Sequence, residues 1–344
     1  MPLFTSSSKK MKLKPTNKEW LLTWALSLII CLSTLGSYEF YLKNKGFSAS
    51  IENNNDLWSW YREKVSNTKN SLVIVGASRS QLDLSMNYLR DNFLNYTVTQ
   101  LSVNGHYPLA TLKALADDAS FNGIVIASIN AQALEPVYFD MQQPQNHYYL
   151  NNATLYKSLD AFLTAKIQSN LRLLHPLLGL RQVVEYYDVN KKFQSAFYTT
   201  AHLDQSVSAN YSLTNVENLY NHFVHSKKQN YLNQPPTEPV KWAENINLLI
   251  QYNQAIVDRG GQVVLVRFPT YKGHWELDEA YYPRELYWDK IEENTDLLTV
   301  HFKDVEGLDQ FDSPDSSHLD QKDSQQFTQL LFDELLKRSY IESK

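Results

Sequence analysis

A nucleophilic serine needs a base within hydrogen-bond reach, and that base needs a third group to orient it. The sequence contains a candidate serine, Ser78, in the stretch Gly76-Ala-Ser-Arg-Ser80. It also contains Asp315-Ser-Ser-His318, whose spacing can hold the carboxylate against one imidazole nitrogen and leave the other nitrogen for a nucleophile. Each motif alone is common, as a helix cap or a surface pair. The catalytic interpretation therefore requires a fold that joins Ser78 to His318.

Donors for an oxyanion are the second requirement of acyl transfer, because charge develops on the carbonyl oxygen in the transition state. Three groups are candidates: the backbone N–H of Ser78 near a helix N-terminus, the backbone N–H of Gly105, and the side-chain amide of Asn130. Gly105 and Asn130 both follow apolar runs, where ordinary turn chemistry is the alternative explanation.

Two arginines, Arg267 and Arg284, are candidates for binding an anionic group of a substrate, because the guanidinium fork fits carboxylates and phosphates. Arg267 lies at the end of an apolar run, and Arg284 lies in the aromatic stretch 281–288. Exposed Tyr and Trp rings of that stretch can stack on sugars. The alternative is that these rings pack the loop onto the core.

The candidate residues follow short apolar runs with the length and flanking turn residues of buried strands. The expected strands cover residues 71–75, 97–103, 123–129, 262–268 and 297–302. Between these strands lie segments whose apolar residues have helical spacing. This alternation predicts an α/β fold: a three-layer sandwich around a mainly parallel, flavodoxin-like sheet. Carboxyl ends of parallel strands meet at one edge, so Ser78, Gly105 and Asn130 are expected beside one crevice. The loop with Asp315 and His318 can return to the same edge.

Residues 131–235 interrupt the alternation of strands and helices. The stretch is rich in Tyr, Asn and Gln, and its apolar residues have helical spacing between positions 155 and 187. We therefore expect a mostly helical insertion that covers one side of the sheet, within a main domain of residues 57–344.

Charge is divided between the N-terminus and the rest of the chain. Residues 1–18 carry five lysines and no acidic residue, so the net charge of −5 leaves −10 on residues 19–344. The uncharged run Trp20–Tyr38 follows, and its helix would span ~28 Å, close to the apolar thickness of a bilayer. A buried helix and a cleaved signal peptide are the alternatives, and the length of the run favours an uncleaved anchor.

The predicted organisation is a basic cytoplasmic tail at 1–18, a transmembrane helix at 19–38, a linker at 39–56 and an outer domain. Lysines before the span place the N-terminus in the cytoplasm, so the main domain is expected to be periplasmic or extracellular. The outer part has no basic stripe and a charge of −10, which argues against nucleic-acid binding. One cysteine, Cys31, excludes a Cys-based zinc site, and the nine histidines lack ligand spacing, so no metal or cofactor is expected.

The order of these elements resembles the SGNH (GDSL-type) hydrolase superfamily. In that family the nucleophilic serine follows the first strand, a glycine follows the second, an asparagine follows the third, and Asp-x-x-His precedes the last helix. Ser78, Gly105, Asn130, Asp315 and His318 match these positions in turn. The resemblance covers about residues 70–130 and 260–338, without the insertion.

Two departures separate the chain from the usual pattern. Ala77 stands where the family has the Asp of Gly-Asp-Ser, and the third block has a single asparagine, Asn130, which puts its share of the oxyanion site in question. A relaxed first block behind a basic N-terminus and one anchor is similar to the membrane-tethered branch, with its alginate O-acetylation factors and D-alanyl-lipoteichoic acid transfer protein.

That resemblance implies ester chemistry on a cell-surface or envelope polysaccharide, beside a multipass membrane acyltransferase. The expected function is a membrane-anchored serine esterase or O-acyltransferase, in which Ser78 attacks, His318 carries the proton and Asp315 orients the imidazole. The alternative is a non-catalytic glycan-binding or scaffold protein with the same fold.

Overall fold

The computed structural model describes residues 16–66, 68–294 and 296–342, so most of the predicted basic tail lies outside the described residues. Its centre is a five-stranded sheet in the order β2-β1-β3-β6-β7, and every pair is parallel. The strands are β1 (Ser71–Val75), β2 (Thr97–Gln100), β3 (Ile124–Ser128), β6 (Gln262–Arg267) and β7 (Leu298–His301). The α/β class and the parallel sheet predicted from the sequence are confirmed.

Helices cover both faces of the sheet, as the three-layer prediction requires. Val73 and Val75 of β1 point to a core that includes α2 (Asn55–Ser66), α5 (Leu109–Asp117) and α11 (Ile246–Val257). Leu72 and Ile74 point to the opposite core with α4 (Met86–Asn92) and α14 (Ser324–Lys337). Because successive strand residues face opposite ways, continuous apolar runs such as 71–75 are what a doubly covered sheet needs.

The strand order places a topological switch beside β1. The chain goes from β1 to β2 on one side and then to β3 on the other side of β1. In open α/β sheets, ligands bind in the crevice at the carboxyl ends of the strands where the order reverses. Both Ser78, directly after β1, and Asn130, directly after β3, lie at this place.

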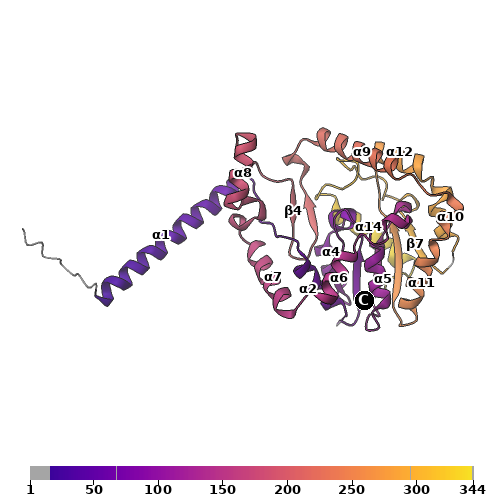
Figure 1. Cartoon of the computed structure of the whole chain (residues 1–344), viewed down its shortest axis with the longest axis horizontal. Helices are drawn as coiled ribbons and strands as arrows, with labels where there is room; N and C mark the ends of the chain where they lie inside the picture. Colours follow the sequence, from indigo (N-terminus) through magenta and orange to yellow (C-terminus); the bar gives the residue numbers. More distant parts are fainter. Residues whose placement is uncertain (1–15, 67, 295, 343–344) are drawn as a thin grey trace, which may run out of the picture.

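A long excursion separates β3 from β6 and builds a layer over this edge of the sheet (Figure 1). Its helices are η1 (Ala131–Leu134), η2 (Pro136–Tyr138), α6 (Gln143–Asn151), α7 (Leu155–Gln168), η3 (Arg172–Leu174), η4 (Pro176–Leu178), α8 (Leu180–Asn190), η5 (Tyr211–Leu213), α9 (Val216–Asn233) and α10 (Pro239–Ala243). It also contains an antiparallel hairpin, β4 (Thr199–Ala201) with β5 (Val207–Ala209), which the sequence did not predict. Strands of three residues are too short to give an apolar run.

The remaining elements follow the last two strands. They are α3 (Ser78–Leu82) after β1, α12 (Lys272–Tyr281), η6 (Arg284–Leu286) and α13 (Trp288–Glu292) after β6, and η7 (Phe302–Asp304) after β7. The loop 305–323 then leads to α14 and carries the Asp-x-x-His motif along the same edge of the sheet.

Helix α1 (Asn17–Asn44) extends away from the domain and, among the described residues, is the one helix long and apolar enough to cross a membrane (Figure 1). It begins with a capping box between Thr16 and Glu19, so its start is defined by the sequence. The segment 39–56 differs from the tether expected: α1 continues to Asn44, and Phe47 and Ile51 are buried. Apolar residues among the polar ones fix this segment to the domain.

Candidate active site

A tight corner holds Ser78 at the end of β1, where Gly76 and Ala77 lead into α3. A Cβ on Gly76 would lie 2.2 Å from Ser80 Oγ and 2.7 Å from Ser128 Cβ, so only glycine fits between α3 and β3. The Ser80 hydroxyl donates to the Ala77 carbonyl at 2.9 Å and closes the turn. The sequence Gly-x-Ser therefore serves to place Ser78 as the first residue of a helix.

Ser78, His318 and Asp315 form a continuous hydrogen-bonded chain. His318 Nε2 lies 2.8 Å from Ser78 Oγ, and His318 Nδ1 lies 2.9 Å from Asp315 Oδ2. An ionised Asp315 only accepts, so Nδ1 carries the proton and donates, and Nε2 then accepts from the serine hydroxyl. This is the arrangement in which an imidazole can take a proton from an attacking serine.

Asp315 is held in the ionised form that this arrangement needs. Its side chain is 1% exposed, and Oδ1 accepts from the backbone N–H groups of Ser317 and His318 at 2.9 and 2.8 Å. Oδ2 accepts from the Tyr211 hydroxyl at 2.7 Å as well as from His318. Burial acts to raise the pKa of Asp315, but His318 together with the Tyr211 and Ser317 donors outweighs it and lowers that pKa to about 2.

Other contacts fix the imidazole itself. The Ser313 hydroxyl donates to the His318 carbonyl at 2.7 Å, and the next N–H, of Leu319, donates to Asp83 Oδ1 at 2.9 Å. The ring of Phe223, from α9 of the insertion, packs edge-on against the His318 ring at 5.3 Å. These contacts hold the His318 backbone and support its ring beside Ser78.

The predicted oxyanion donors surround the same cavity as Ser78. Gly105 has φ +73°, a conformation that favours glycine, and its N–H donates to no other described residue. Asn130 also lines the cavity, but its Oδ1 accepts from Ala133 N–H and its Nδ2 donates to the Tyr107 hydroxyl at 3.3 Å. Asn130 is thus a helix cap whose amide N–H still reaches the cavity.

The cavity beside Ser78 has a volume of about 370 Å³. Its wall includes Ala77, Gly105, Tyr107, Ser128, Asn130, Gln132, Tyr138, Met141, Ser226, Phe268 and three basic residues, Arg79, Lys227 and Arg267. No acidic side chain is among the described residues that line it. The space suits a small polar group such as a sugar ring, with basic groups on its wall.

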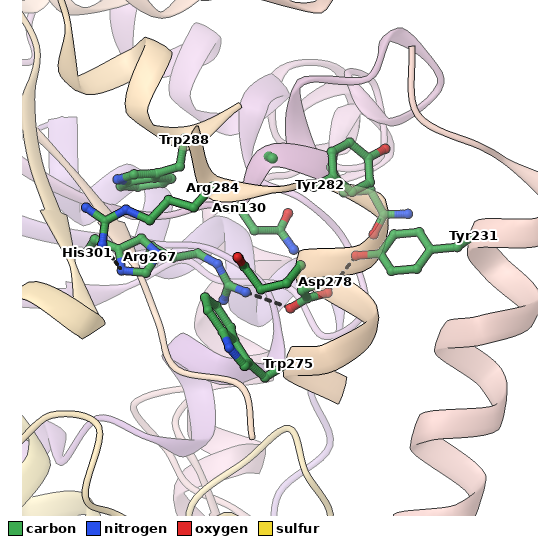
Figure 2. A pocket seen from close by; sticks show the side chains of 12 residues that line it. Asn130, Tyr231, Arg267, Trp275, Asp278, Tyr282, Arg284, Trp288 and His301 are labelled. Atoms are coloured by element: carbon green, nitrogen blue, oxygen red, sulfur yellow. Dashed lines mark hydrogen bonds and ion pairs between the residues drawn. The ribbon is translucent and has the colours of Figure 1, made fainter. Parts of the chain in front are cut away.

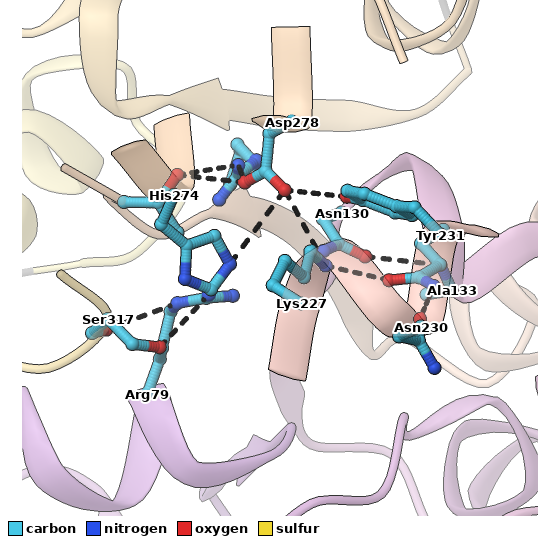
Figure 3. Close-up of polar contacts among 12 residues, drawn as sticks. Arg79, Asn130, Ala133, Lys227, Asn230, Tyr231, His274, Asp278 and Ser317 are labelled. Atoms are coloured by element: carbon cyan, nitrogen blue, oxygen red, sulfur yellow. Dashed lines mark hydrogen bonds and ion pairs between the residues drawn. The ribbon is translucent and has the colours of Figure 1, made fainter. Parts of the chain in front are cut away.

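A buried carboxylate, Asp278 of α12, lies behind this wall and joins several polar groups (Figure 3). Arg267 Nη2 donates to Oδ2 at 2.6 Å, and the Tyr231 hydroxyl donates to Oδ1 at 2.6 Å. Lys227 Nζ is 3.5 Å from Oδ1. Burial acts to raise the pKa of Asp278, but the charge of Lys227 and the other cations lowers it well below its usual range.

The two arginines predicted to bind substrate have different environments. Arg267 reaches the cavity beside Ser78, although it is 5% exposed and paired with Asp278. Arg284 does not line that cavity: it contacts Asp289 at 2.8 Å and Asp304 at 2.6 Å and lines a separate pocket of about 20 Å³ (Figure 2). Acidic neighbours on α13 and η7 thus hold Arg284 outside the cavity beside Ser78, so the structure does not bring it together with the other candidate residues, and its binding of substrate stays a prediction.

Sequence reasoning missed the side chains that the insertion contributes. Tyr211 and Phe223 contact Asp315 and His318, and Lys227 enters the cavity. No motif or spacing distinguishes these residues from the other tyrosines, phenylalanines and lysines of the stretch 131–235. Among the described residues, no group of three His, Cys, Asp or Glu side chains is placed to hold a metal ion.

Comparison with known proteins gives structural likeness but no match in sequence. No family model matches the chain, and no curated protein matches it. Among solved structures, the crystal structure of TesA aligns with 77% of this chain and 97% of its own, at 12% identity and a TM-score of 0.34. The molecule itself combines a parallel α/β fold with hydrogen-bonded Ser78, His318 and Asp315 at the topological switch point of the sheet.

Proposed function

We propose that the protein is a serine esterase or O-acyltransferase of SGNH type, with Ser78 as the nucleophile. The observation that carries the proposal is the hydrogen-bonded chain from Ser78 through His318 to Asp315. The location of these three residues also supports the proposal, because they lie at the carboxyl edge of the sheet, beside a cavity of about 370 Å³.

In the first step, Ser78 Oγ attacks an ester carbonyl while its proton moves to His318 Nε2. Asp315 stabilises the resulting imidazolium, and the N–H groups of Ser78 and Gly105, with the amide of Asn130, hold the oxyanion. His318 then gives the proton to the departing alkoxide, which leaves as an alcohol. The acyl group remains as an ester of Ser78.

In the second step, an acceptor hydroxyl removes the acyl group from Ser78. His318 takes the proton of the acceptor and returns it to Ser78 Oγ when the ester breaks. Water as the acceptor makes the protein an esterase, and a sugar hydroxyl makes it an O-acyltransferase. A cavity with room for a sugar ring beside Ser78 supports a glycan acceptor or donor.

Helix α1 supports the further proposal that the enzyme is anchored in a membrane with its domain outside. Its length and apolar composition suit a span, and Lys18, in the first turn of α1 before the uncharged run, agrees with a cytoplasmic N-terminus. The substrate would then be a polysaccharide or other acylated envelope polymer, and a multipass membrane acyltransferase would supply the acyl group.

The test uses the full chain in detergent with a fluorescent fluorophosphonate, which labels activated serines, and with 4-nitrophenyl acetate. Wild type is expected to label once and to release nitrophenol, and Ser78→Ala is expected to do neither. Ser48→Ala, which removes an exposed hydroxyl outside the cavity, is the control and should keep both activities.

Labelling that persists in Ser78→Ala would overturn the assignment of the nucleophile. Folded wild type that neither labels nor hydrolyses would favour the scaffold alternative. Adding a glucoside to the acetyl ester assay then separates the two enzyme classes, because a transferase forms acetylated glucoside and an esterase forms acetate.

A further inference from the structure

The cavity beside Ser78 has more positive than negative charge. Arg79, Lys227 and Arg267 line it, and among the described residues Asp278 is the one carboxylate that pairs with Lys227 and Arg267. Asp278 is already paired at 2.6 Å with Arg267, so the other two cations lack a full partner. Arg79 and Lys227 are partly buried, and a cation withdrawn from water without a partner is costly, which makes an added anion favourable at this place.

Arg79 directs its guanidinium into the cavity through neutral partners. Its Nε and Nη2 donate to the Ser317 carbonyl and hydroxyl at 3.2 and 3.1 Å, and Nη2 also contacts His274 Nε2 at 3.1 Å (Figure 3). Within the described residues it forms no ion pair with a carboxylate, and Nη1 donates to none of them. His274 is neutral beside it, because burial and the neighbouring cations lower the pKa of the imidazole.

Lys227 faces the same space from α9. Its Nζ donates to Gln132 Oε1 at 2.7 Å, lies 4.3 Å from the centre of the Tyr231 ring, and is 3.5 Å from Asp278 Oδ1. Its side chain is 10% exposed. An ammonium so enclosed and only loosely paired is a ready partner for a substrate anion.

We propose that Arg79 and Lys227 bind an anionic group of the substrate, a carboxylate or a phosphate, next to the ester that Ser78 attacks. This inference rests on the proposed function and specifies its substrate as an acidic glycan. The anionic group would place the acyl-bearing hydroxyl against Ser78, since both cations and the serine line one cavity.

Binding is tested without turnover by using Ser78→Ala and ligand-observed NMR saturation transfer. Methyl glucuronide and glucose 6-phosphate are the anionic probes, and methyl glucoside is the neutral one. We expect at least one anionic probe to bind roughly ten-fold or more tightly than the neutral probe, a difference of ~1.4 kcal/mol. The stronger of the two identifies a carboxylate or a phosphate as the natural group.

Arg79→Gln and Lys227→Gln, each in the Ser78→Ala background, should lose this preference. Lys272→Gln is the control, because it removes an exposed cation that pairs with Asp312 outside the cavity. Equal binding of all three probes, or an anion preference that survives both cavity substitutions, would overturn the proposal. Because the background is catalytically inactive, failure of the proposed hydrolysis would leave this result unaffected.

A second inference starts from the outer end of α1. Glu39, the first residue after the uncharged run, accepts from Arg172 Nη1 at 2.9 Å and from the Leu173 N–H at 3.0 Å. Arg172 Nε also donates to the Phe47 carbonyl at 2.8 Å. These contacts fix η3 beside the end of α1, at the level where the proposed membrane span ends.

The chain after η3 exposes several large apolar side chains. Leu180, Val184 and Tyr187 share one face of α8 and are 82%, 57% and 45% exposed, and Phe193, which packs on Tyr187 at 5.1 Å, is 73% exposed. We call Leu177, Leu180, Val184, Tyr187 and Phe193 the α8 apolar face. In Figure 1, α8 lies next to the end of α1.

We infer that the α8 apolar face lies on the lipid surface around α1. Continuity with the proposed span argues for lipid as the occupant, because η3 connects this face directly to the end of α1. A helix with one apolar face and charged residues such as Arg181 and Glu185 beside it is the kind that binds at a bilayer interface.

The test uses the full chain in phosphatidylcholine vesicles with an NBD fluorophore at single cysteines. Leu180→Cys and Val240→Cys are made in a Cys31→Ser background, and native Cys31 labels the middle of α1. Val240 is 83% exposed on α10 and serves as the matched control. Lipids with doxyl groups should quench NBD at positions 31 and 180 and leave position 240 unquenched.

Quenching at position 31 without quenching at position 180 would overturn the inference and leave the membrane span intact. Absence of quenching at position 31 would remove the span and the α8 contact together. Equal quenching at positions 180 and 240 would also overturn it, because the whole domain would then contact lipid.

Discussion

Ser78 Oγ and His318 Nε2 are 2.8 Å apart although the two residues are separated by 240 positions in the chain. The parallel sheet produces this meeting, since β1 and the loop before α14 end at the same edge. The position of His318 relative to Ser78 therefore depends on the whole fold.

Substitutions in the hydrogen-bonded chain should abolish ester hydrolysis without unfolding the domain. Asp315→Asn keeps the shape but favours the wrong imidazole tautomer, and we expect kcat to fall roughly 10⁴-fold, as in other Ser-His-Asp sites. Ser78→Ala combined with Asp315→Asn should be no worse than Ser78→Ala alone, because the residues act as a unit. Steady-state kinetics with 4-nitrophenyl acetate measure both, and additive losses would contradict a shared mechanism.

Tyr211→Phe removes the hydroxyl that donates to Asp315 Oδ2 at 2.7 Å. Loss of a hydrogen bond to a buried carboxylate should lower the free energy of unfolding by about 1.5–3 kcal/mol. The pKa of Asp315 should rise, so the loss of stability on acidification should begin at a higher pH than in wild type. Unfolding in detergent between pH 6 and pH 2.5 measures both effects, and Tyr198→Phe, on a neighbouring ring, is the control. An unchanged pH dependence of unfolding would show that Tyr211 has only a packing role.

Gly76→Ala should destabilise the corner that carries Ser78. The added methyl would overlap Ser80 and Ser128, and overpacking of this kind costs about 1–3 kcal/mol. Because the backbone must shift at the nucleophile, kcat should fall more than KM changes. Gly36→Ala, at a position with open space around it, is the control. Thermal unfolding and kinetics equal to wild type would mean that the corner adapts.

Acid stability should depend on Asp315. Its pKa in the folded protein, about 2, is below its ordinary value, so the ionised form stabilises the fold by about 2 kcal/mol at neutral pH. This contribution is complete above about pH 5 and is lost as pH falls toward 2. The difference in unfolding free energy between wild type and Asp315→Asn should therefore shrink from pH 6 to pH 2.5. A constant difference would contradict an ionised Asp315.

Anion binding should weaken as pH rises through about 8. Burial is the largest influence on the pKa of Lys227 and lowers it. The charge of Asp278 raises this pKa, and the charges of Arg79 and Arg267 lower it, with a result of about 8. The charged and titratable groups that face Lys227 are Arg79, Arg267, Tyr231, His274 and Asp278. Saturation transfer with the preferred anion from pH 6.5 to 9.5 should show the loss, and Lys227→Arg should remove it. A flat profile for the native lysine would contradict the assignment.

The sequence predicted those candidate site residues that come directly after a strand. Ser78 and Asn130 come directly after apolar runs, so their meeting at one edge follows from the parallel sheet. Tyr211 and Lys227 belong to the insertion, whose path over the sheet is set by tertiary packing that has no local periodicity. The sequence did not show that Arg284 lies outside the cavity beside Ser78, because its ion pair with Asp304 joins segments on either side of β7.

The insertion contacts α1 at Arg172 and the carboxylate of Asp315 at Tyr211. One stretch of chain, residues 172–211, therefore connects the stem of the protein to its proton relay. A change in the length of this stretch would therefore be expected to disturb the contact with Glu39 and the contact with Asp315 together.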